Sequence, residues 1–372
     1  MYNRHMKILD LKLSEYRNCI DLELDLKNPK ILIIGKNAQG KTNILESIYF
    51  LSSLKSPRTS NNLELINFDA EKFEICANIV KSETDISLDY SYSKEKIKEI
   101  KVNKVKVKPK EFKSILKTVL FSTTDLLLLR GSPDNRREWL DRAINQIYPA
   151  YDERLSKYEK IRVQKNNFLK NCLKTGQYNE ELLEVFNEQL LITGSNIIYL
   201  RKKFLKEIEQ IAKQKHNKIS ENEDLRLDYS CNFLDNQTEI EDIANAFRQS
   251  LEERKTEEQR RGQACVGPHR DDILFYINGN DATKFASQGQ QRTVVLALKL
   301  SELDIITSKT GDEPILLLDD VLAELDDVRQ NYLLKSIKPE IQTIITSVDT
   351  LLFDKDFLNS VKIYNIENGK IV

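Results

Sequence analysis

The octapeptide GKNAQGKT at residues 35–42 restricts the fold more than any other part of the sequence. It follows the apolar run ILII and precedes the helix-forming run NILESIYFL. A G-x-x-x-x-G-K-[ST] loop between a strand and a helix points backbone N–H groups at phosphate oxygens, and the start of the helix favours negative charge. The sequence therefore predicts an α/β core whose first central strand leads into a phosphate-binding loop, the P-loop.

Residue types within the P-loop match separate tasks. Lys41 is expected to reach the β- and γ-phosphates of a nucleotide, and the Thr42 hydroxyl is expected to bind Mg²⁺. Glycine permits the unusual dihedrals and the close approach of a phosphate. The alternative is a chance match in a turn, which the flanking strand and helix patterns disfavour. The expected nucleotide-binding residues of the loop are Gly35, Lys36, Asn37, Ala38, Gln39, Gly40, Lys41, Thr42 and Asn43.

A second apolar run, ILLLDDVLAELD, begins at residue 315 and supplies the carboxylates that the P-loop lacks. Asp319 at the end of the predicted strand is expected to hold the Mg²⁺ shell. Asp320 is positioned to orient or deprotonate the attacking water in phosphoryl transfer. The alternative is an ordinary strand end with a helix N-cap. Asp320 and Lys41 are accordingly the predicted catalytic residues, and Thr42 and Asp319 are the predicted metal ligands.

A long helical segment separates these two motifs. Proline is absent between Pro149 and Pro268, and glycine is rare in that interval. Apolar residues at helical spacings predict one amphipathic helix from about residue 179 to about residue 217. The run LRLDYSCNFL at 225–234 predicts a short strand, and residues 239–261 resume the helical pattern.

Strand patterns lie on both sides of the helical segment. LDLKL and IDLELDL alternate apolar and polar residues around the tripeptide YRN, which predicts a half-exposed antiparallel pair. ILIIG and ILLLDD are unbroken apolar runs, as expected of central strands covered on both faces. The expected fold class is α/β: a P-loop core with an antiparallel β subdomain, split by a compact helical insertion. The expected domains are the N-terminal half of the head (1–132), the helical lobe (133–262) and the C-terminal half of the head (263–372).

Composition narrows the class of protein. With 40% hydrophobic residues, a mean hydropathy of −0.48 and a charged start, the chain is expected to be cytoplasmic, with neither a signal peptide nor a membrane partner. The 57 Lys and Arg residues nearly balance 58 Asp and Glu residues, so any contact with nucleic acid requires a local basic patch. Five scattered cysteines without a CxxC pair indicate reduced thiols.

The sequence SQGQ provides a third motif, two residues before the apolar run TVVLALKLSELDII. Ser287, Gly289 and Gln290 would form another helix start that can hold a phosphate. A single subunit that binds one nucleotide does not need two phosphate-binding sites. Two subunits that share their nucleotides would use both. The motif resembles the S-x-G-Q signature of ABC-type ATPases, in which the signature of one protomer caps the γ-phosphate on the P-loop of the other. The alternative is a simple helix cap.

Further segments extend the resemblance over nearly the whole chain, which is similar to the RecF family of DNA-repair ATPases, related to the heads of SMC and Rad50 proteins. The segments at residues 121–141 and 267–272 are not general features of ABC-type ATPases. The insertion of roughly 120 residues is also too short for an SMC arm. The matching segments are EYRN (15–18), SPRTSNNLELINF (56–68), FSTTDLLLLRGSPDNRREWLD (121–141) and GPHRDD (267–272).

The resemblance implies an ABC-type ATPase head and assigns further residues to it. Arg17 and Arg58 match family positions near the P-loop, which implies nucleotide contact. Asp326 in AELD stands where the D-loop, an interface segment, should be. Thr346 falls near the switch histidine of transporter ATPases, and Asp320 stands where those enzymes use glutamate. Two other departures are Ala38, where many relatives have glycine, and Gln288, which replaces the middle glycine of S-G-G-Q.

The implied function is that of a slow ATPase that uses ATP and Mg²⁺. The resemblance implies an ATP-dependent homodimer that binds DNA at gaps or single-strand/double-strand junctions in recombinational repair and replication. RecR and RecO are the implied partners, which help to load the recombinase. Two alternatives remain: an ABC-type transport ATPase subunit, and a nucleotide-gated scaffold with negligible hydrolysis.

Three basic or polar segments remain ambiguous. Residues 94–113 alternate lysine with apolar residues and predict a hairpin around Asn103, which is either a solvated edge or a phosphate-contacting patch. Arg136 and Arg137 open a predicted helix and belong either to such a patch or to the head interface. GPHRDD at 267–272 suggests a metal site or, more simply, an N-cap and salt-bridge cluster.

Overall fold

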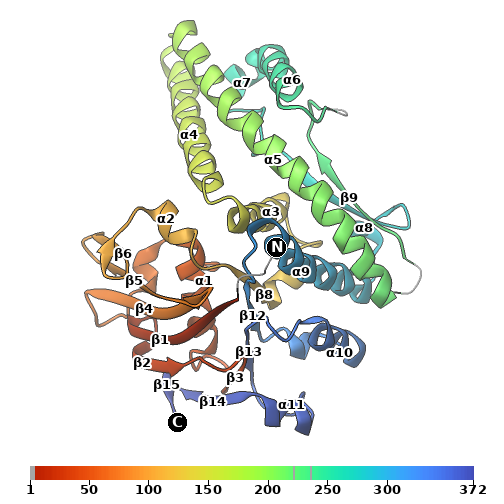
Figure 1. Ribbon diagram of the computed structural model, residues 1–372. Coiled ribbons are helices and arrows are strands. Elements are labelled where there is room, and N and C mark those ends of the chain that lie inside the picture. Colours follow the sequence, from red (N-terminus) through yellow and green to blue (C-terminus); the bar gives the residue numbers. More distant parts are fainter. Residues whose placement is uncertain (1–4, 221–222, 235–236) are drawn as a thin grey trace. The chain divides into compact units, whose positions relative to one another are not determined.

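The computed structural model describes residues 5–220, 223–234 and 237–372, so the first four residues of MYNRHMKILD lie outside it. The chain forms two compact units (Figure 1). We call them the head unit and the inserted unit. The head unit comprises Met1–Leu127, Lys218–Ser220 and Gly289–Val372, and the inserted unit comprises Leu128–Asn217 and Glu221–Gln288.

A six-stranded sheet forms the centre of the head unit, in the order β15-β14-β3-β13-β12-β8. Five strands run parallel, and β15 pairs antiparallel with β14. The apolar runs ILII and ILLL are buried in β3 and β12, on either side of β13, which confirms the prediction of central strands. The carboxyl ends of these parallel strands lie at one edge of the sheet. Gly35 after β3, Asp319 at the end of β12 and Ser347 at the end of β13 therefore lie at the same edge. The strands are β3 (Lys30–Ile34), β8 (Thr118–Ser122), β12 (Ile315–Asp319), β13 (Thr343–Ser347), β14 (Lys362–Glu367) and β15 (Lys370–Ile371).

Two largely buried helices, α1 and α9, belong to this core. Helix α1 starts at Lys41, within the last two residues of the P-loop motif, and buries ten of its 13 residues. Helix α9 is buried along most of its length. The helices of the head unit are α1 (Lys41–Ser53), α2 (Pro109–Lys113), α9 (Gln288–Thr310), α10 (Asp327–Ser336) and α11 (Lys355–Ser360), with short 3₁₀ turns η1 (Asn62–Leu65), η2 (Thr123–Leu127) and η3 (Leu322–Glu324).

An antiparallel sheet of order β2-β1-β4-β5-β6-β7 completes the head unit. Strands β1 and β2 pair antiparallel, as predicted from their alternating pattern. The lysine-rich hairpin is also confirmed: Asn103 and Lys104 have φ of 49° and 65°, the left-handed conformation of a two-residue type I′ turn. The strands are β1 (Met6–Tyr16), β2 (Cys19–Asp25), β4 (Lys72–Lys81), β5 (Thr84–Ser93), β6 (Lys98–Val102) and β7 (Val105–Lys106).

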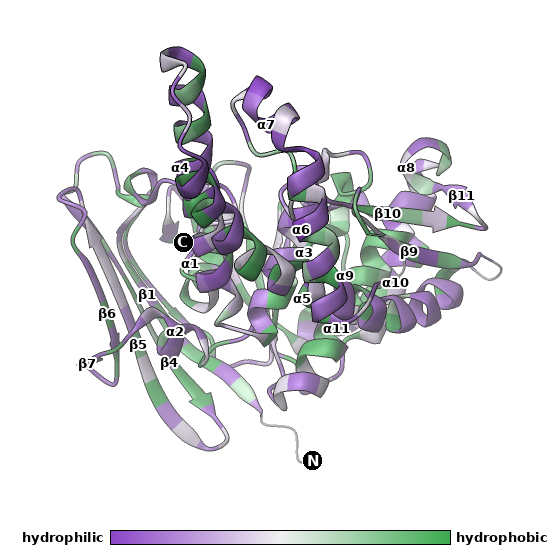
Figure 2. Cartoon of the chain, turned by 90° about the horizontal axis from the view of Figure 1, so that it is seen from above, coloured by the Kyte–Doolittle hydropathy of each residue, from purple (hydrophilic) through white to green (hydrophobic). Residues whose placement is uncertain are grey.

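The inserted unit contains the predicted long helix as α5, packed with shorter helices. Helix α4 alternates hydrophilic and hydrophobic residues, whereas α7 is hydrophilic throughout (Figure 2). Its helices are α3 (Pro133–Ile147), α4 (Tyr151–Thr175), α5 (Glu180–Ser220), α6 (Ile240–Glu253), α7 (Lys255–Arg261) and α8 (Ala282–Phe285). Its strands are β9 (Leu225–Ser230), β10 (Asp272–Ile277) and β11 (Asn280–Asp281).

The inserted unit extends beyond the segment expected from the sequence. We expected the lobe to end at residue 262, but residues 263–288 group with it. The cause is strand pairing: β10 pairs antiparallel with β9, with Phe275 opposite Leu227. The lobe is therefore a helical unit with its own three-stranded sheet, β11-β10-β9.

Candidate functional site

The P-loop backbone requires glycine at two positions. At Gly35 a Cβ atom would lie 2.4 Å from the carbonyl oxygen of Ile366 in β14. Gly40 has φ of 109° and immediately precedes α1, and a Cβ atom there would lie 2.8 Å from Oδ1 of Asn18. At Gly35 a side chain would displace the loop from the backbone of β14, and at Gly40 the positive φ would strain any other residue. The glycines of the motif thus let the loop pass close to its neighbours and turn into the helix.

Ala38 also adopts the left-handed conformation, with φ of 65°. This conformation costs an L-residue other than glycine about 1–2 kcal/mol. The geometry explains why glycine suits this position and why alanine, the smallest alternative, is tolerated there.

Lys41 is held inside the loop. Its side chain is only 3% exposed, and its Nζ donates hydrogen bonds to the carbonyl oxygens of Gly35 at 2.7 Å and Lys36 at 3.3 Å. Nζ also lies 3.7 Å from Oδ2 of Asp320. The ammonium group therefore stands between the loop and the carboxylate, where it can neutralise phosphate charge.

Thr42 and Asp319 form the candidate Mg²⁺ site. The Thr42 hydroxyl donates to Oδ1 of Asp319 at 2.9 Å, and the Thr346 hydroxyl lies 3.0 Å from the same oxygen. Burial raises the pKa of Asp319, and the two hydroxyls oppose this rise. A hydroxyl and a carboxylate are the hard oxygen donors that Mg²⁺ takes alongside nucleotide phosphates, so these residues fit the ion. When bound, Mg²⁺ would neutralise the charge of the phosphates.

Asp320 lies beside this pair in a constrained conformation. Its φ is 51°, and its backbone N–H donates to the Thr346 hydroxyl at 2.9 Å. Within the described residues, its Oδ1 is buried and has no hydrogen-bond partner. The geometry leaves one carboxylate oxygen available to accept a proton from water, while Oδ2 faces Lys41. Thr346 thus positions both aspartates.

Arg17 and Arg58 meet at Glu46, a residue that sequence reasoning missed. Arg17 donates to both Glu46 oxygens, at 2.7 and 2.8 Å, and to the carbonyl oxygen of Glu64 at 3.3 Å. Arg58 donates to Oδ1 of Asn43 at 2.7 Å, and its Nη1 lies 3.4 Å from Glu46. The available signal was a single acidic residue within the apolar helix run NILESIYFL.

The C-terminal hairpin β14–β15 supports the P-loop from the other side and was also missed. The backbone N–H groups of Asn368 and Gly369 donate to Gln39, to its Oε1 at 2.7 Å and its carbonyl oxygen at 2.9 Å. Their φ values of 49° and 75° form a type I′ turn. The dipeptide Asn-Gly in IENGKIV was the signal for this turn.

The signature residues lie at the start of α9. The helix begins at Gln288, so Gly289 and Gln290 occupy its first turn and Ser287 directly precedes it. The expectation placed all of SQGQ before the helix, whereas the helix starts one residue after Ser287. The first turn of this 23-residue helix leaves backbone N–H groups without intrahelical partners, which suits an anion.

Asp326 serves as the N-cap of α10. Its side chain accepts a hydrogen bond from the Arg329 backbone N–H at 2.9 Å and pairs with the Arg329 guanidinium. Arg329 also donates to the Thr293 hydroxyl of α9 at 2.8 Å. The Asp326 segment and the signature helix thus form a second group within the head unit, linked through Arg329.

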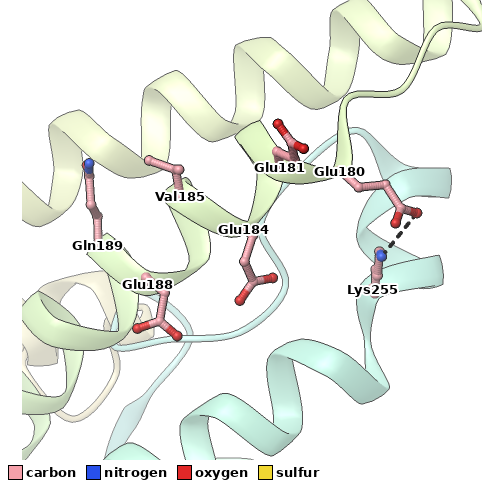
Figure 3. Close-up of a pocket in the computed structure, with 7 residues that line it drawn as sticks. All are labelled: Glu180, Glu181, Glu184, Val185, Glu188, Gln189 and Lys255. Carbon is pink, nitrogen blue, oxygen red and sulfur yellow. Dashed lines mark hydrogen bonds and ion pairs between the residues drawn. The ribbon is translucent and has the colours of Figure 1, made fainter.

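A pocket of about 650 Å³ lies in the inserted unit (Figure 3). Because carboxylates repel phosphate, this acidic pocket does not suit a nucleotide. The pocket was not predicted from the sequence. Its lining residues are Glu180, Glu181, Glu184, Val185, Glu188, Gln189 and Lys255.

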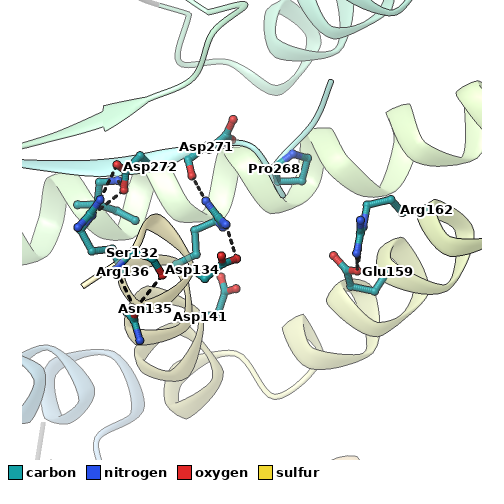
Figure 4. Close-up of polar contacts among 12 residues, drawn as sticks. Ser132, Asp134, Asn135, Arg136, Asp141, Glu159, Arg162, Pro268, Asp271 and Asp272 are labelled. Carbon is teal, nitrogen blue, oxygen red and sulfur yellow. Dashed lines mark hydrogen bonds and ion pairs between the residues drawn. The ribbon is translucent and has the colours of Figure 1, made fainter. Parts of the chain in front are cut away.

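The aspartates of the GPHRDD segment form salt bridges and hydrogen bonds within the inserted unit (Figure 4). Arg136 binds both oxygens of Asp272, at 2.7 and 2.8 Å, and Arg137 donates to the backbone carbonyl of Asp271. Burial raises the pKa of the Asp271 side chain to about 6, against hydrogen bonding from Tyr229. The two arginines therefore tie the GPHRDD segment to α3, which confirms the salt-bridge part of the interpretation. The N-cap part is wrong, because Asp272 begins strand β10 and not a helix.

His269 in the same segment is engaged on both ring nitrogens. Nε2 lies 3.2 Å from the carbonyl oxygen of Ala264, and Nδ1 lies 2.7 Å from the Tyr158 hydroxyl. Because the carbonyl only accepts, Nε2 carries the proton and Nδ1 accepts from Tyr158. Burial lowers the pKa of His269 to about 3, so the ring is neutral at pH 7. In the described part of the chain no cluster of three or more His, Cys, Asp or Glu side chains could hold a metal ion.

Comparison with known sequences shows which proteins this chain resembles. The family described as "RecF/RecN/SMC N terminal domain" matches residues 7–372. The chain is 41% identical over 370 residues to the DNA replication and repair protein RecF of Bacillus velezensis, covering 99% of this chain and 100% of that one. It is 40% identical, with the same coverage, to RecF of Bacillus subtilis. Across the described residues, no helix is both long and apolar enough to span a membrane.

Solved structures of RecF proteins are also similar to this chain. The recombination mediator protein RecF-ATP in the RecFOR pathway superposes with a TM-score of 0.91 and 33% identity, covering 100% of this chain and 98% of that chain. The RecF-ATPrS structure gives a TM-score of 0.91 and 32% identity over 100% and 99%. An Smc head from Pyrococcus furiosus, at 15% identity and a TM-score of 0.55, covers 99% of this chain and 96% of that chain and shares the fold. The chain belongs to the RecF family, in the SMC-related group of ABC-type ATPases.

Proposed function

We propose that the protein is an ATP-dependent DNA-binding protein of recombinational repair and replication. The hydrogen-bonded array of Thr42, Asp319, Thr346 and Asp320 around Lys41 carries the proposal, because it unites the P-loop with two carboxylates at one sheet edge. The similarity to RecF-ATP and RecF-ATPrS supports ATP as the nucleotide. Mg²⁺ is the proposed metal, held by Thr42 and Asp319.

The placement of Asp320 beside Lys41 supports a proposal for hydrolysis. Asp320 takes a proton from a water that attacks the γ-phosphorus, the bond to the β–γ bridging oxygen breaks, and Lys41 stabilises the charge on the phosphates. The aspartate side chain is one methylene shorter than the glutamate of transporter ATPases. We therefore propose slow turnover, which suits a timing switch.

Two helix starts that each suit a phosphate in one chain support the proposal of a dimer. The first turns of α1 and α9 each suit a phosphate, and one bound nucleotide needs a single P-loop. Two protomers arranged head to tail would use both, with Ser287, Gly289 and Gln290 of one facing ATP on the other. Affinity for the γ-phosphate would then close the dimer on DNA, and hydrolysis would open it. Gapped or junction DNA is the proposed substrate, and RecR and RecO are the proposed partners.

Exchanging Ser287 for a larger, charged residue tests this arrangement. Wild-type protein with Mg²⁺ and ATP is expected to sediment at about twice its 43.3 kDa mass, and with ADP as a monomer. Ser287→Arg is expected to remain monomeric with either nucleotide, because the guanidinium fills the space for the phosphate. Sedimentation velocity measures both.

Ser308→Arg is the matched control, since Ser308 is exposed near the other end of α9. It should dimerise like wild type. If the Ser287→Arg protein still dimerises with ATP, the signature residues do not lie in the dimer interface. If the wild-type protein stays monomeric with ATP, even when DNA is added, the proposed ATP-dependent dimer is wrong.

The lysine hairpin is the proposed phosphate-contacting patch for DNA. Lys101 and Lys106 lie 2.9 and 2.8 Å from Glu99, and Lys104 lies exposed at the turn, so three cations accompany one carboxylate. Replacing Lys104 and Lys106 with glutamate is expected to weaken binding of gapped DNA. The slope of log affinity against log salt should fall by about two, roughly one for each lysine that no longer neutralises a phosphate.

A fluorescence anisotropy titration across salt concentrations measures this effect. Lys157→Glu with Lys160→Glu, two exposed positions on α4, makes the same change in net charge elsewhere. An unchanged affinity in the hairpin variant would make the hairpin a solvated edge. Equal losses in both variants would show that only net charge matters.

A further inference from the structure

The fully buried carboxylate of Glu46 organises the surroundings of the P-loop. Its side chain is 0% exposed in α1. It accepts two hydrogen bonds from Arg17, at 2.7 and 2.8 Å, and one from the Ser56 hydroxyl at 2.5 Å. A buried charge is tolerated when it is paired and hydrogen-bonded, and the two-pronged contact with Arg17 meets that requirement.

A second guanidinium at the same carboxylate leaves an excess positive charge. Arg58 lies 3.4 Å from Glu46, so two arginines share one carboxylate. Arg17 is 18% exposed and spends its donors on Glu46 and on the Glu64 carbonyl. Arg58 is 46% exposed and donates to Asn43, the residue after the candidate metal ligand Thr42. The uncompensated charge is therefore that of Arg58, beside the phosphate-binding loop.

We infer that Glu46 is a positioning residue that divides the roles of two arginines. It fixes Arg17 as a structural clamp between α1 and the β1–β2 turn, and it holds Arg58 so that its charge faces an anion bound at Thr42 and Asn43. This inference rests on the proposed function, in which the anion is the phosphate chain of ATP.

Arg58→Gln tests the inference directly, because a half-exposed side chain can be replaced without disturbing the core. We expect the Kd for a fluorescent ATP analogue with Mg²⁺ to rise about tenfold, the usual effect of removing one charge-assisted hydrogen bond. Arg58→Lys keeps the charge and should restore part of the affinity. Arg248→Gln is the matched control, since Arg248 is 47% exposed and pairs with Glu188 in the inserted unit.

A double-mutant cycle tests the positioning role of Glu46. Glu46→Gln keeps the size of the side chain and removes its charge, and we expect a Kd increase similar to that of Arg58→Gln. Glu46→Gln combined with Arg58→Gln should bind no more weakly than Arg58→Gln alone, because both remove one arrangement. Additive losses would reduce Glu46 to a general structural role.

The outcomes separate this inference from the proposed function. If the wild-type protein does not bind the ATP analogue, the proposed function itself fails. If the wild type binds and Arg58→Gln binds equally well, only the inference fails. Thermal unfolding of each variant shows whether Glu46→Gln remains folded. If Glu46→Gln does not fold, the Kd values of the Arg58 variants decide whether the inference holds.

Discussion

Replacing Asp320 with asparagine is expected to lower the turnover number for ATP by about a hundredfold or more while leaving Mg²⁺ and ATP bound. Removing a general base costs on the order of 10²–10⁴ in rate. The Mg²⁺ ligands Thr42 and Asp319 are untouched by this change, and Lys41 keeps its hydrogen bonds to the Gly35 and Lys36 carbonyl oxygens, so nucleotide affinity should remain. Bound ATP should then persist, and the dimer should accumulate.

Asparagine is the appropriate replacement because of the backbone at this position. Asp320 has φ of 51°, and asparagine tolerates the left-handed conformation better than alanine does. The hydrogen bond from its backbone N–H to Thr346 also remains possible. A loss of activity in Asp320→Asn therefore reports on the carboxylate and not on a displaced backbone.

Phosphate release at saturating ATP gives the turnover number, and sedimentation gives the dimer. Asp319→Asn is the contrasting variant, expected to lose Mg²⁺-dependent ATP binding as well as turnover. Unchanged turnover in Asp320→Asn would remove Asp320 from the role of base. If wild-type protein binds ATP but shows no turnover above background, the nucleotide-gated scaffold becomes the better description.

The sequence predicted those parts of the site that depend on neighbouring residues. The P-loop, the strand before it and the helix after it are one continuous segment, and Asp319 ends an apolar strand of recognisable pattern. Glu46 could not be assigned from the sequence because its task depends on Arg58, which arrives from a separate loop. The support of Gln39 by Asn368 and Gly369 joins residues more than 300 positions apart.

The extent of the inserted unit was harder to predict for the same reason. Helical periodicity located α5 well because the pattern is local and long. The pairing of β10 with β9 depends on contacts between distant segments, and a two-strand pairing leaves little periodic signal. The sequence therefore predicted the strand β9 but not its pairing with β10, and so missed the true position of the last residues of the lobe.

Removing the buried Arg201 is expected to destabilise the inserted unit by about 3–5 kcal/mol. Arg201 in α5 binds both oxygens of Asp141 in α3 at 2.8 Å and the carbonyl oxygen of Pro268 at 2.7 Å. Its side chain is 3% exposed, and that of Asp141 is 12% exposed. Arg201→Met would leave the Asp141 carboxylate buried without its cation.

Trp139 makes this measurement specific, because it is the single tryptophan of the chain and lies buried in α3. Its fluorescence during urea unfolding reports on the inserted unit. Arg162→Met is the control, since the surface pair of Arg162 with Glu159 should contribute less than about 1 kcal/mol. Loss of equal stability in both variants would contradict the assignment of Arg201 as the central polar contact of this unit.

The double variant Arg201→Met with Asp141→Leu separates pairing from packing. Replacing both charges with apolar groups removes the uncompensated carboxylate, so much of the missing stability should return. The Pro268 carbonyl would still lack its donor, which leaves a smaller deficit. Full recovery would mean that the ion pair adds little net stability and instead selects one packing of α3 and α5 against the GPHRDD segment. No recovery would mean that the hydrogen bonds lost at the Pro268 carbonyl and at the buried Tyr151 hydroxyl, and not the unpaired carboxylate, account for the loss.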